Sequence, residues 1–208
     1  MTPPSMPESN DREARAEARR VLRKRLIEQR LAMSPGLHAS LSGRINANLQ
    51  TNFPELAEKR VTFYWPMKNE PDLRPLLRQW FQRGQPGFMA LLPVVEERGQ
   101  PLVFKTWIPD TPLSADALGL PAPDENTATI TPEVLLIPVN AFDKAGYRLG
   151  YGGGFFDRTL ARLAPSSLSI GVGFELSRVD SIDPNPNDMR LDAVVTEANI
   201  YRFGGSTP

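Results

Sequence analysis

Apolar residues recur every four positions in two stretches near the start of the chain, which is the period of one helix face. They are Ala14, Ala18, Leu22 and Leu26 in the first stretch, and Leu37, Leu41, Ile45 and Leu49 in the second. The pattern predicts two amphipathic helices that precede the first strand, one over residues 11–33 and one that ends near residues 52–54.

Short apolar runs rich in β-branched and aromatic residues predict strands at 60–65, 87–95, 102–108, 134–139, 169–174 and 191–196. Helical spacing returns from Pro71 and from Arg158, and the proline-rich segment 109–132 is predicted to be an irregular connection. Strands that alternate with helices predict an α/β fold, with a mostly parallel sheet covered by helices on both faces. Ligands of such a sheet bind at the carboxyl ends of its strands.

The length of 208 residues fits one domain, which we place at residues 11–203. The composition of residues 1–10 and 204–208 predicts a disordered lead and a flexible tail. Lys and Arg balance Asp and Glu at 24 each, so we expect small-molecule partners, and no nucleic acid or membrane. We also expect a monomer. The chain has no cysteine, no secretory signal and no apolar run long enough for a bilayer, so we expect it to be cytoplasmic.

The densest group of candidate functional residues lies in IPVNAFDKAGYRLGYGGGFFDRTL, at positions 137–160. A strand is followed by a glycine-rich loop and then by a new helix, an order that suits phosphate binding. The glycines let backbone N–H groups approach an anion, the helix contributes its positive end, and Arg148 adds a charged clamp. A tight turn that needs positive φ is the alternative, and the spacing matches neither the Walker A loop nor GxGxxG.

The string RLGYGGGFFDR, preceded by PVNAFD, closely resembles the motif of the 5-formyltetrahydrofolate cyclo-ligases, also called methenyltetrahydrofolate synthetases. The resemblance extends from about residue 19 to residue 197, through RRVLR at 19–23, YWPMKNEPD at 64–72 and NDMRLDAVVTE at 187–197. It implies a Rossmann-like α/β fold and the conversion of 5-formyltetrahydrofolate to 5,10-methenyltetrahydrofolate with ATP and Mg²⁺. ATP would phosphorylate the formyl oxygen, and ADP and phosphate would be released.

The resemblance also implies a role for individual residues. The family's ATP contacts correspond to Arg19, Arg23, Arg148, Gly150, Gly152, Gly153, Gly154 and Phe156. Its folate contacts correspond to Trp65, Glu70, Tyr151, Gly152, Gly153, Gly154 and Phe155, and its Mg²⁺ ligands to Asp157 and Asp188. We expect no protein nucleophile, because phosphoryl transfer relies on positioning and on charge stabilisation, here by Arg148.

Two features depart from the family's pattern. Phe155 and Phe156 stand where most members have tyrosines, and Arg19 stands where lysine is usual. These departures leave open a non-catalytic relative that binds a folate or a nucleotide. An enzyme for a sugar phosphate on a similar α/β scaffold is a second alternative, because its glycine loop could bind the phosphate of the substrate.

Overall fold

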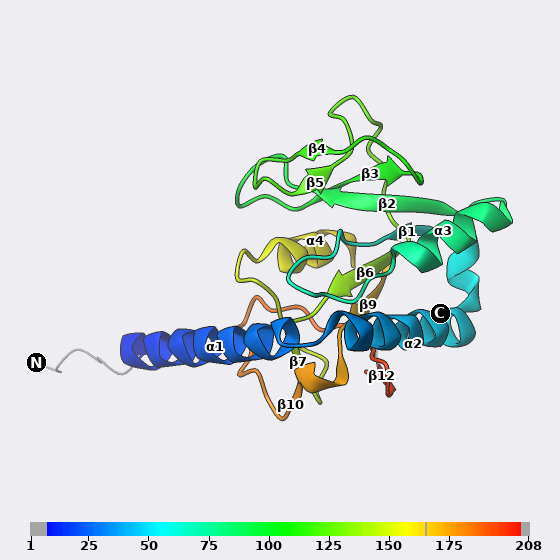
Figure 1. Cartoon of the computed structure of the whole chain (residues 1–208). Helices are drawn as coiled ribbons and strands as arrows, with labels where there is room; N and C mark the ends of the chain where they lie inside the picture. The colour runs from blue at the N-terminus through cyan, green and yellow to red at the C-terminus, as the bar shows by residue number, and fades with distance from the viewer. Residues whose placement is uncertain (1–7, 165, 205–208) are drawn as a thin grey trace, which may run out of the picture.

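A seven-stranded sheet forms the centre of the computed structural model, which describes residues 8–164 and 166–204 (Figure 1). Its strand order is β12-β11-β9-β6-β1-β2-β3. The bounds are β1 Arg60–Thr62, β2 Met89–Val94, β3 Val103–Trp107, β6 Val134–Pro138, β9 Leu168–Val172, β11 Ala193–Val195 and β12 Ile200–Arg202. The inner strands from β11 to β2 are parallel, and β3 and β12 run antiparallel at the two edges. The predicted mostly parallel sheet is confirmed.

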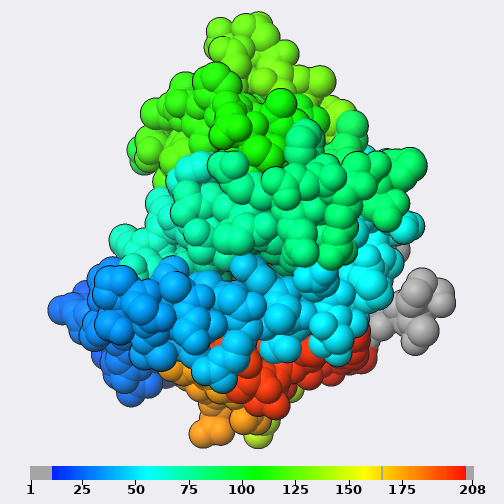
Figure 2. Space-filling view, turned by 45° about the vertical axis from the view of Figure 1, so that its right-hand side comes forward, coloured from blue at the N-terminus to red at the C-terminus, as the bar shows by residue number. Residues whose placement is uncertain are grey.

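The α-helices of the described residues are α1 Glu8–Leu31, α2 Pro35–Asn52, α3 Arg74–Arg83 and α4 Phe155–Leu163. Two short 3-10 helices, η1 Pro54–Glu58 and η2 Glu175–Ser177, follow α2 and β9. The boundary between α1 and α2 follows from Ser34, whose hydroxyl accepts a hydrogen bond from the backbone N–H of Leu37. α1 and α2 run one after the other across the molecule, as the blue-to-cyan band of Figure 2 shows.

α1 begins at Glu8, three residues before its predicted start. Asp11 therefore falls in the first turn of the helix, where an acidic residue interacts favourably with the positive end of the helix dipole. The rest of the predicted lead, residues 1–7, and residues 205–208 of the predicted tail lie outside the described residues.

Both faces of the sheet are apolar, and helices cover each of them. Along β6, Val134 and Leu136 pack with residues of α2 and α3, while Leu135 and Ile137 pack with Leu160 of α4. A strand buried on both faces has no polar alternation, which is why this segment reads as a continuous apolar run.

Several short strands fall in segments that the sequence pattern assigns to loops. The hairpin of β7 (Ala141–Asp143) and β8 (Arg148–Leu149) separates β6 from the glycine loop, and it forms a small sheet with β10 (Arg178–Val179). Another hairpin, β4 (Ser114–Ala115) with β5 (Pro121–Ala122), lies in the segment predicted to be irregular. Strands of two or three residues are too short to show an alternating pattern, so the prediction of unbroken loops was wrong at these positions.

The β7–β8 hairpin is held by a buried carboxylate. One oxygen of Asp143 accepts hydrogen bonds from the N–H groups of Ala145 and Tyr147, and the other accepts from Ile182. Asp143 therefore holds the turn that leads into the glycine loop.

None of the helices in the described part of the chain is both long and apolar enough to span a membrane.

A pair of glycine substitutions tests the packing of the sheet. A Cβ at Gly171 in β9 would lie 2.6 Å from Leu191 and 2.8 Å from Val194, whereas a Cβ at Gly43 in α2 would meet nothing within 4 Å. We expect Gly171→Ala to lower the free energy of unfolding by about 1–3 kcal/mol through overpacking. Gly43→Ala should raise it by about 0.5–1 kcal/mol, because alanine favours the helix. Urea denaturation measures both, and equal effects would contradict the packing.

Candidate active site

The glycine loop lies between β8 and α4, and its backbone requires glycine at two positions. Gly152 has φ of 101° and Gly154 has φ of 65°, both in the left-handed region that other residues avoid. Gly154 is also the N-cap of α4, and no side chain caps the helix there. The first N–H groups of α4 thus keep their capacity to donate to an anion at the loop.

Arginines from two helices contact the carbonyl groups of this loop. Arg23 of α1 donates to the carbonyl of Gly150 at 2.6 Å, and Arg158 of α4 donates to the carbonyl of Gly153 at 2.7 Å. The guanidinium of Arg158 also lies over the ring of Phe155, 5.1 Å from its centroid. Positive charge from α1 and from α4 therefore lies next to the loop, as expected for a site that binds phosphate groups.

Each of the two predicted metal ligands forms an ion pair with an arginine beside the loop. Arg148 donates to Asp157 at 2.9 Å and to the carbonyl of Met189 at 3.0 Å, while Asp188 accepts from Arg19 at 2.6 Å. The N–H of Met189 also donates to Asp157, so residues 188–189 bring both carboxylates together. Burial lowers the pKa of Arg148, and the charges of Asp157 and Asp188 oppose that shift.

The burial of Arg148 bears on its predicted role. Only 5% of Arg148 is exposed, and its guanidinium is already bonded to Asp157 and to a backbone carbonyl. This arrangement indicates that Arg148 orients Asp157 and does not bind a ligand directly.

The donor set at this point fits Mg²⁺. Oδ1 of Asp157 and Oδ2 of Asp188 accept the contacts described above, and each carboxylate has a second oxygen for a ligand. Mg²⁺ is commonly held by one or two carboxylates together with phosphate oxygens and water. Within residues 8–164 and 166–204, no group of three or more His, Cys, Asp or Glu side chains could hold a metal ion unaided.

Glu70 lies in a buried polar cluster on the other side of the glycine loop. Only 2% of Glu70 is exposed, and its carboxylate accepts hydrogen bonds from the Tyr151 hydroxyl at 2.7 Å and from the N–H of Met67 at 3.0 Å. Arg30 of α1 donates to the same hydroxyl at 2.9 Å and lies 4.0 Å from Glu70. Burial raises the pKa of Glu70, and these hydrogen bonds and the charge of Arg30 oppose that shift.

Sequence reasoning missed Arg30 and Asn140, which the structure brings into this cluster. Arg30 donates to the side-chain oxygen of Asn140 at 3.0 Å, and only 2–3% of either residue is exposed. A signal was present in the sequence, because Arg30 continues the four-residue spacing of Leu22 and Leu26. A cation on the apolar face of a helix must find a buried partner, so it is a candidate functional residue.

Trp65 and Phe156 are partly buried and pack against the hydrophobic core. Trp65 packs at the edge of the core, and Arg74 lies 4.8 Å above its ring. Phe156 packs against the core cluster on the α4 face of the sheet. Trp65 and Glu70 share the loop between β1 and α3, but no hydrogen bond or stacking contact between described residues joins them.

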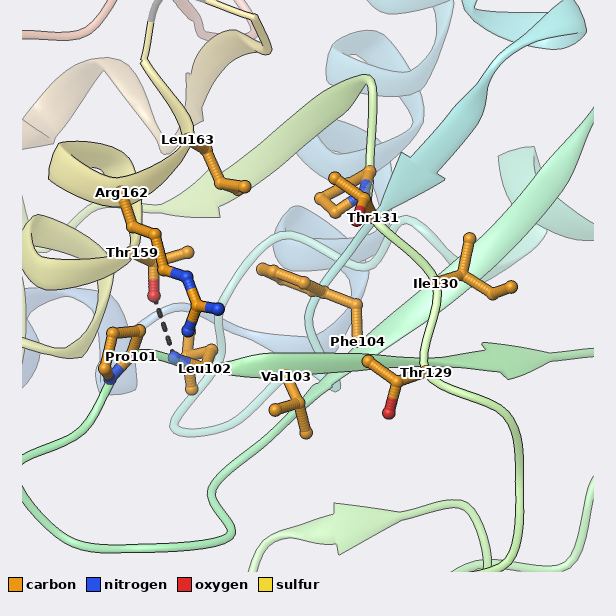
Figure 3. A pocket seen from close by; sticks show the side chains of 11 residues that line it. Pro101, Leu102, Val103, Phe104, Thr129, Ile130, Thr131, Thr159, Arg162 and Leu163 are labelled. Carbon is orange, nitrogen blue, oxygen red and sulfur yellow. Dashed lines mark hydrogen bonds between the residues drawn. The ribbon is translucent and has the colours of Figure 1, made fainter.

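A separate hollow of about 120 Å³ lies between α4 and β3 (Figure 3). Its lining is mainly apolar, with Phe104 and Ile130 among the residues that face it, and Leu102 donates a backbone hydrogen bond to Thr159 at its rim. None of the predicted site residues lines it. The candidate active site instead lies around the glycine loop, at the carboxyl ends of the parallel strands.

The fold and this site define an α/β protein with a glycine loop at the carboxyl ends of a mostly parallel sheet, flanked by two aspartates and a buried glutamate. The model of the 5-formyltetrahydrofolate cyclo-ligase family matches residues 15–197. The chain therefore belongs to the 5-formyltetrahydrofolate cyclo-ligase family, and it is an enzyme of that class. Membership favours the cyclo-ligase interpretation over a sugar-phosphate enzyme.

Individual relatives agree with the family assignment. A 5-formyltetrahydrofolate cyclo-ligase of Haemophilus influenzae is 30% identical over 139 residues, which are 64% of this chain and 73% of the relative. That of Escherichia coli K12 is 25% identical over 181 residues, 85% of this chain and 98% of the relative. The solved 5,10-methenyltetrahydrofolate synthetase of Aquifex aeolicus is 27% identical and superposes with a TM-score of 0.77, over 91% of this chain and 95% of the other.

The pairing of Arg148 with Asp157 can be tested through stability. We expect Arg148→Met to lower the free energy of unfolding by about 3 kcal/mol, because it leaves Asp157 without its buried partner. Arg162→Met is the control, since Arg162 is exposed in the last turn of α4, the helix that carries Asp157, and should change stability by less than about 1 kcal/mol. Urea denaturation compares the two, and an Arg148 variant as stable as the control would refute the structural role.

Proposed function

We propose that this chain converts 5-formyltetrahydrofolate to 5,10-methenyltetrahydrofolate in a reaction that consumes ATP, requires Mg²⁺ and releases ADP and phosphate. The observation that carries the proposal is the position of the glycine loop between two clusters. On one side lie Asp157 and Asp188, and on the other lies the buried Glu70. A nucleotide and a folate bound at these clusters would meet at the loop.

The chemistry explains why ATP is needed. A formyl oxygen is a poor leaving group, so phosphoryl transfer from ATP to that oxygen, with loss of ADP, converts it to a phosphate ester. The neighbouring folate nitrogen then attacks the formyl carbon, its N–H proton is lost, and the C–O bond breaks to release phosphate. Such a transfer depends on positioning and charge neutralisation, which agrees with the absence of cysteine and of an assigned nucleophile.

The phosphate groups would bind the backbone of the glycine loop and the N-terminus of α4. Arg19 and Arg23 reach this region from α1 and would supply positive charge. Bound Mg²⁺ would neutralise phosphate charge, with Asp157 and Asp188 as its protein ligands. Arg148 would act through Asp157, because it is buried behind that carboxylate.

The folate would bind at Glu70, whose carboxylate can accept the N–H donors of the pterin ring. A carboxylate has about four acceptor positions, and the Tyr151 hydroxyl and the Met67 N–H occupy two of them. Trp65 and Phe155 would supply apolar contacts. Tyr151 is 39% exposed, so a ligand can reach its ring, and its hydroxyl lies against the buried Glu70 carboxylate.

An absorbance assay tests the proposed reaction. Purified protein mixed with 5-formyltetrahydrofolate, ATP and Mg²⁺ is expected to form methenyltetrahydrofolate, and omission of ATP or chelation of Mg²⁺ should stop product formation. Stoichiometric release of ADP and phosphate is the second readout. A protein that binds both ligands but forms no product would support the non-catalytic alternative suggested by Phe155 and Phe156.

Substitution of the aspartates tests the metal site. We expect Asp157→Asn and Asp188→Asn each to lower kcat by about a hundredfold or more and to raise the Mg²⁺ requirement, because an amide keeps the shape but loses the charge. The double variant should be little slower than either single one, since the groups act as a unit.

The control for this series is Asp183→Asn, which removes the charge of an exposed aspartate that pairs with Arg15 of α1. It should retain the wild-type rate and Mg²⁺ dependence. If either Asp157→Asn or Asp188→Asn behaves like this control, that aspartate is not a metal ligand.

A further inference from the structure

Arg30 is a buried cation at the meeting point of four segments of the chain. Its guanidinium donates to the carbonyl of Lys68 at 2.8 Å, to the Asn140 side chain at 3.0 Å and to the Tyr151 hydroxyl at 2.9 Å. These partners belong to the loop after β1, to the connection between β6 and β7 and to the glycine loop. One side chain of α1 therefore connects the segments that carry the proposed folate and nucleotide contacts.

Arg30 and Glu70 compensate each other's burial. Only 2% of each is exposed, and an isolated charge at such depth is strongly disfavoured unless a partner and hydrogen bonds replace water. Their closest atoms lie 4.0 Å apart, and the Tyr151 hydroxyl bridges them by accepting from Arg30 and donating to Glu70. Arg30 also lies in the last turn of α1, where the helix dipole favours a cation.

We propose that Arg30 is a positioning residue for the folate substrate: it holds the Glu70 carboxylate in its charged, hydrogen-bond-accepting form and fixes the Tyr151 hydroxyl against it. The inference rests on the proposed function, because Glu70 is the group that would accept the pterin donors. Arg30 itself would not touch the reacting atoms. It would act through Glu70 and Tyr151.

The charged and titratable groups around Glu70 show why Arg30 has this role. They are Arg30 from α1, His38 from α2, Tyr64 at the end of β1, Lys68 and Asp72 from the loop that holds Glu70, and Tyr151 from the glycine loop. Burial raises the pKa of Glu70, and Arg30 and Lys68 are the cations that oppose the shift. Lys68 is exposed to solvent, whereas Arg30 is buried with the carboxylate.

The expected effect of removing Arg30 follows from the sign of that shift. Without the buried cation, the pKa of Glu70 rises further, so the carboxylate is ionised only at higher pH. A protonated carboxyl donates from one oxygen and accepts less, and pterin donors lose their acceptor. Folate affinity should then improve as pH rises, by about tenfold per pH unit below the new pKa.

The test is an equilibrium titration of 5-formyltetrahydrofolate, without ATP, from about pH 6 to about pH 9. For Arg30→Gln we expect a Kd at low pH about a hundredfold above that of the wild type, with most of the loss recovered at high pH. The Kd for ATP should change by less than about threefold. Arg20→Gln is the matched control, because Arg20 is an exposed arginine of the same helix that pairs with Glu17.

Two further variants separate positioning from a merely structural role. Arg30→Lys keeps the charge but cannot bond three partners in the arginine geometry, so its folate Kd should be raised about equally at every pH. The double variant Arg30→Gln/Glu70→Gln removes both charges and should regain stability lost by Arg30→Gln, while folate binding stays weak and independent of pH.

The outcomes distinguish this inference from the proposed function. A wild type that neither binds nor converts 5-formyltetrahydrofolate overturns the proposed function. If the wild type binds it, an Arg30→Gln variant with the wild-type pH profile overturns the role of Arg30. Should Arg30→Gln not fold, Arg30→Lys decides the matter, because a wild-type folate Kd in that variant would also overturn it.

Discussion

A charge removed from water must be given a partner, and this constraint determines how α1 is attached to the rest of the protein. α1 adds few apolar residues to the core, with Leu26 buried beside Ala141, Leu149 and Ile182. Its arginines bind carboxylates and carbonyl groups in the loops at the carboxyl edge of the sheet. The helix is thus held by polar contacts whose partners are the proposed ligand-binding segments, so its attachment and the geometry of the site depend on the same bonds.

The same network gives the glycine loop its electrostatic surroundings. Arg23 bonds the start of the loop, Tyr151 within it bonds Glu70, and Asp157 just beyond it is paired with Arg148. Each carboxylate of the site therefore lies against an arginine. Such pairing compensates the charges that folding removes, wholly or in part, from water.

The two phenylalanines at the start of α4 occupy different surroundings. Phe156 packs into the core on one face of the sheet, while Phe155 lies beneath the guanidinium of Arg158. Both side chains have apolar or cation–π contacts that need no hydroxyl. A tyrosine hydroxyl is still present at the site, since Tyr151 bonds both Glu70 and Arg30.

The sequence alone predicted the features that depend on local pattern. Apolar spacing identified α1, α2 and the buried strand β6, and the glycine motif located the loop together with Asp157. Strands of two or three residues, such as β7 and β8, escaped prediction because their pairing partners, and not their own periodicity, define them.

Only the tertiary structure decided which charges meet. Arg30 and Glu70 are 40 residues apart in sequence, and the sequence marks both as polar without indicating that they share one buried cluster. The motif suggests that Arg148 binds an anion directly, yet in the folded protein it is buried and paired with Asp157. The physical reason is that periodicity reports which residues leave water, whereas the partner that compensates a buried charge is set by how distant segments pack.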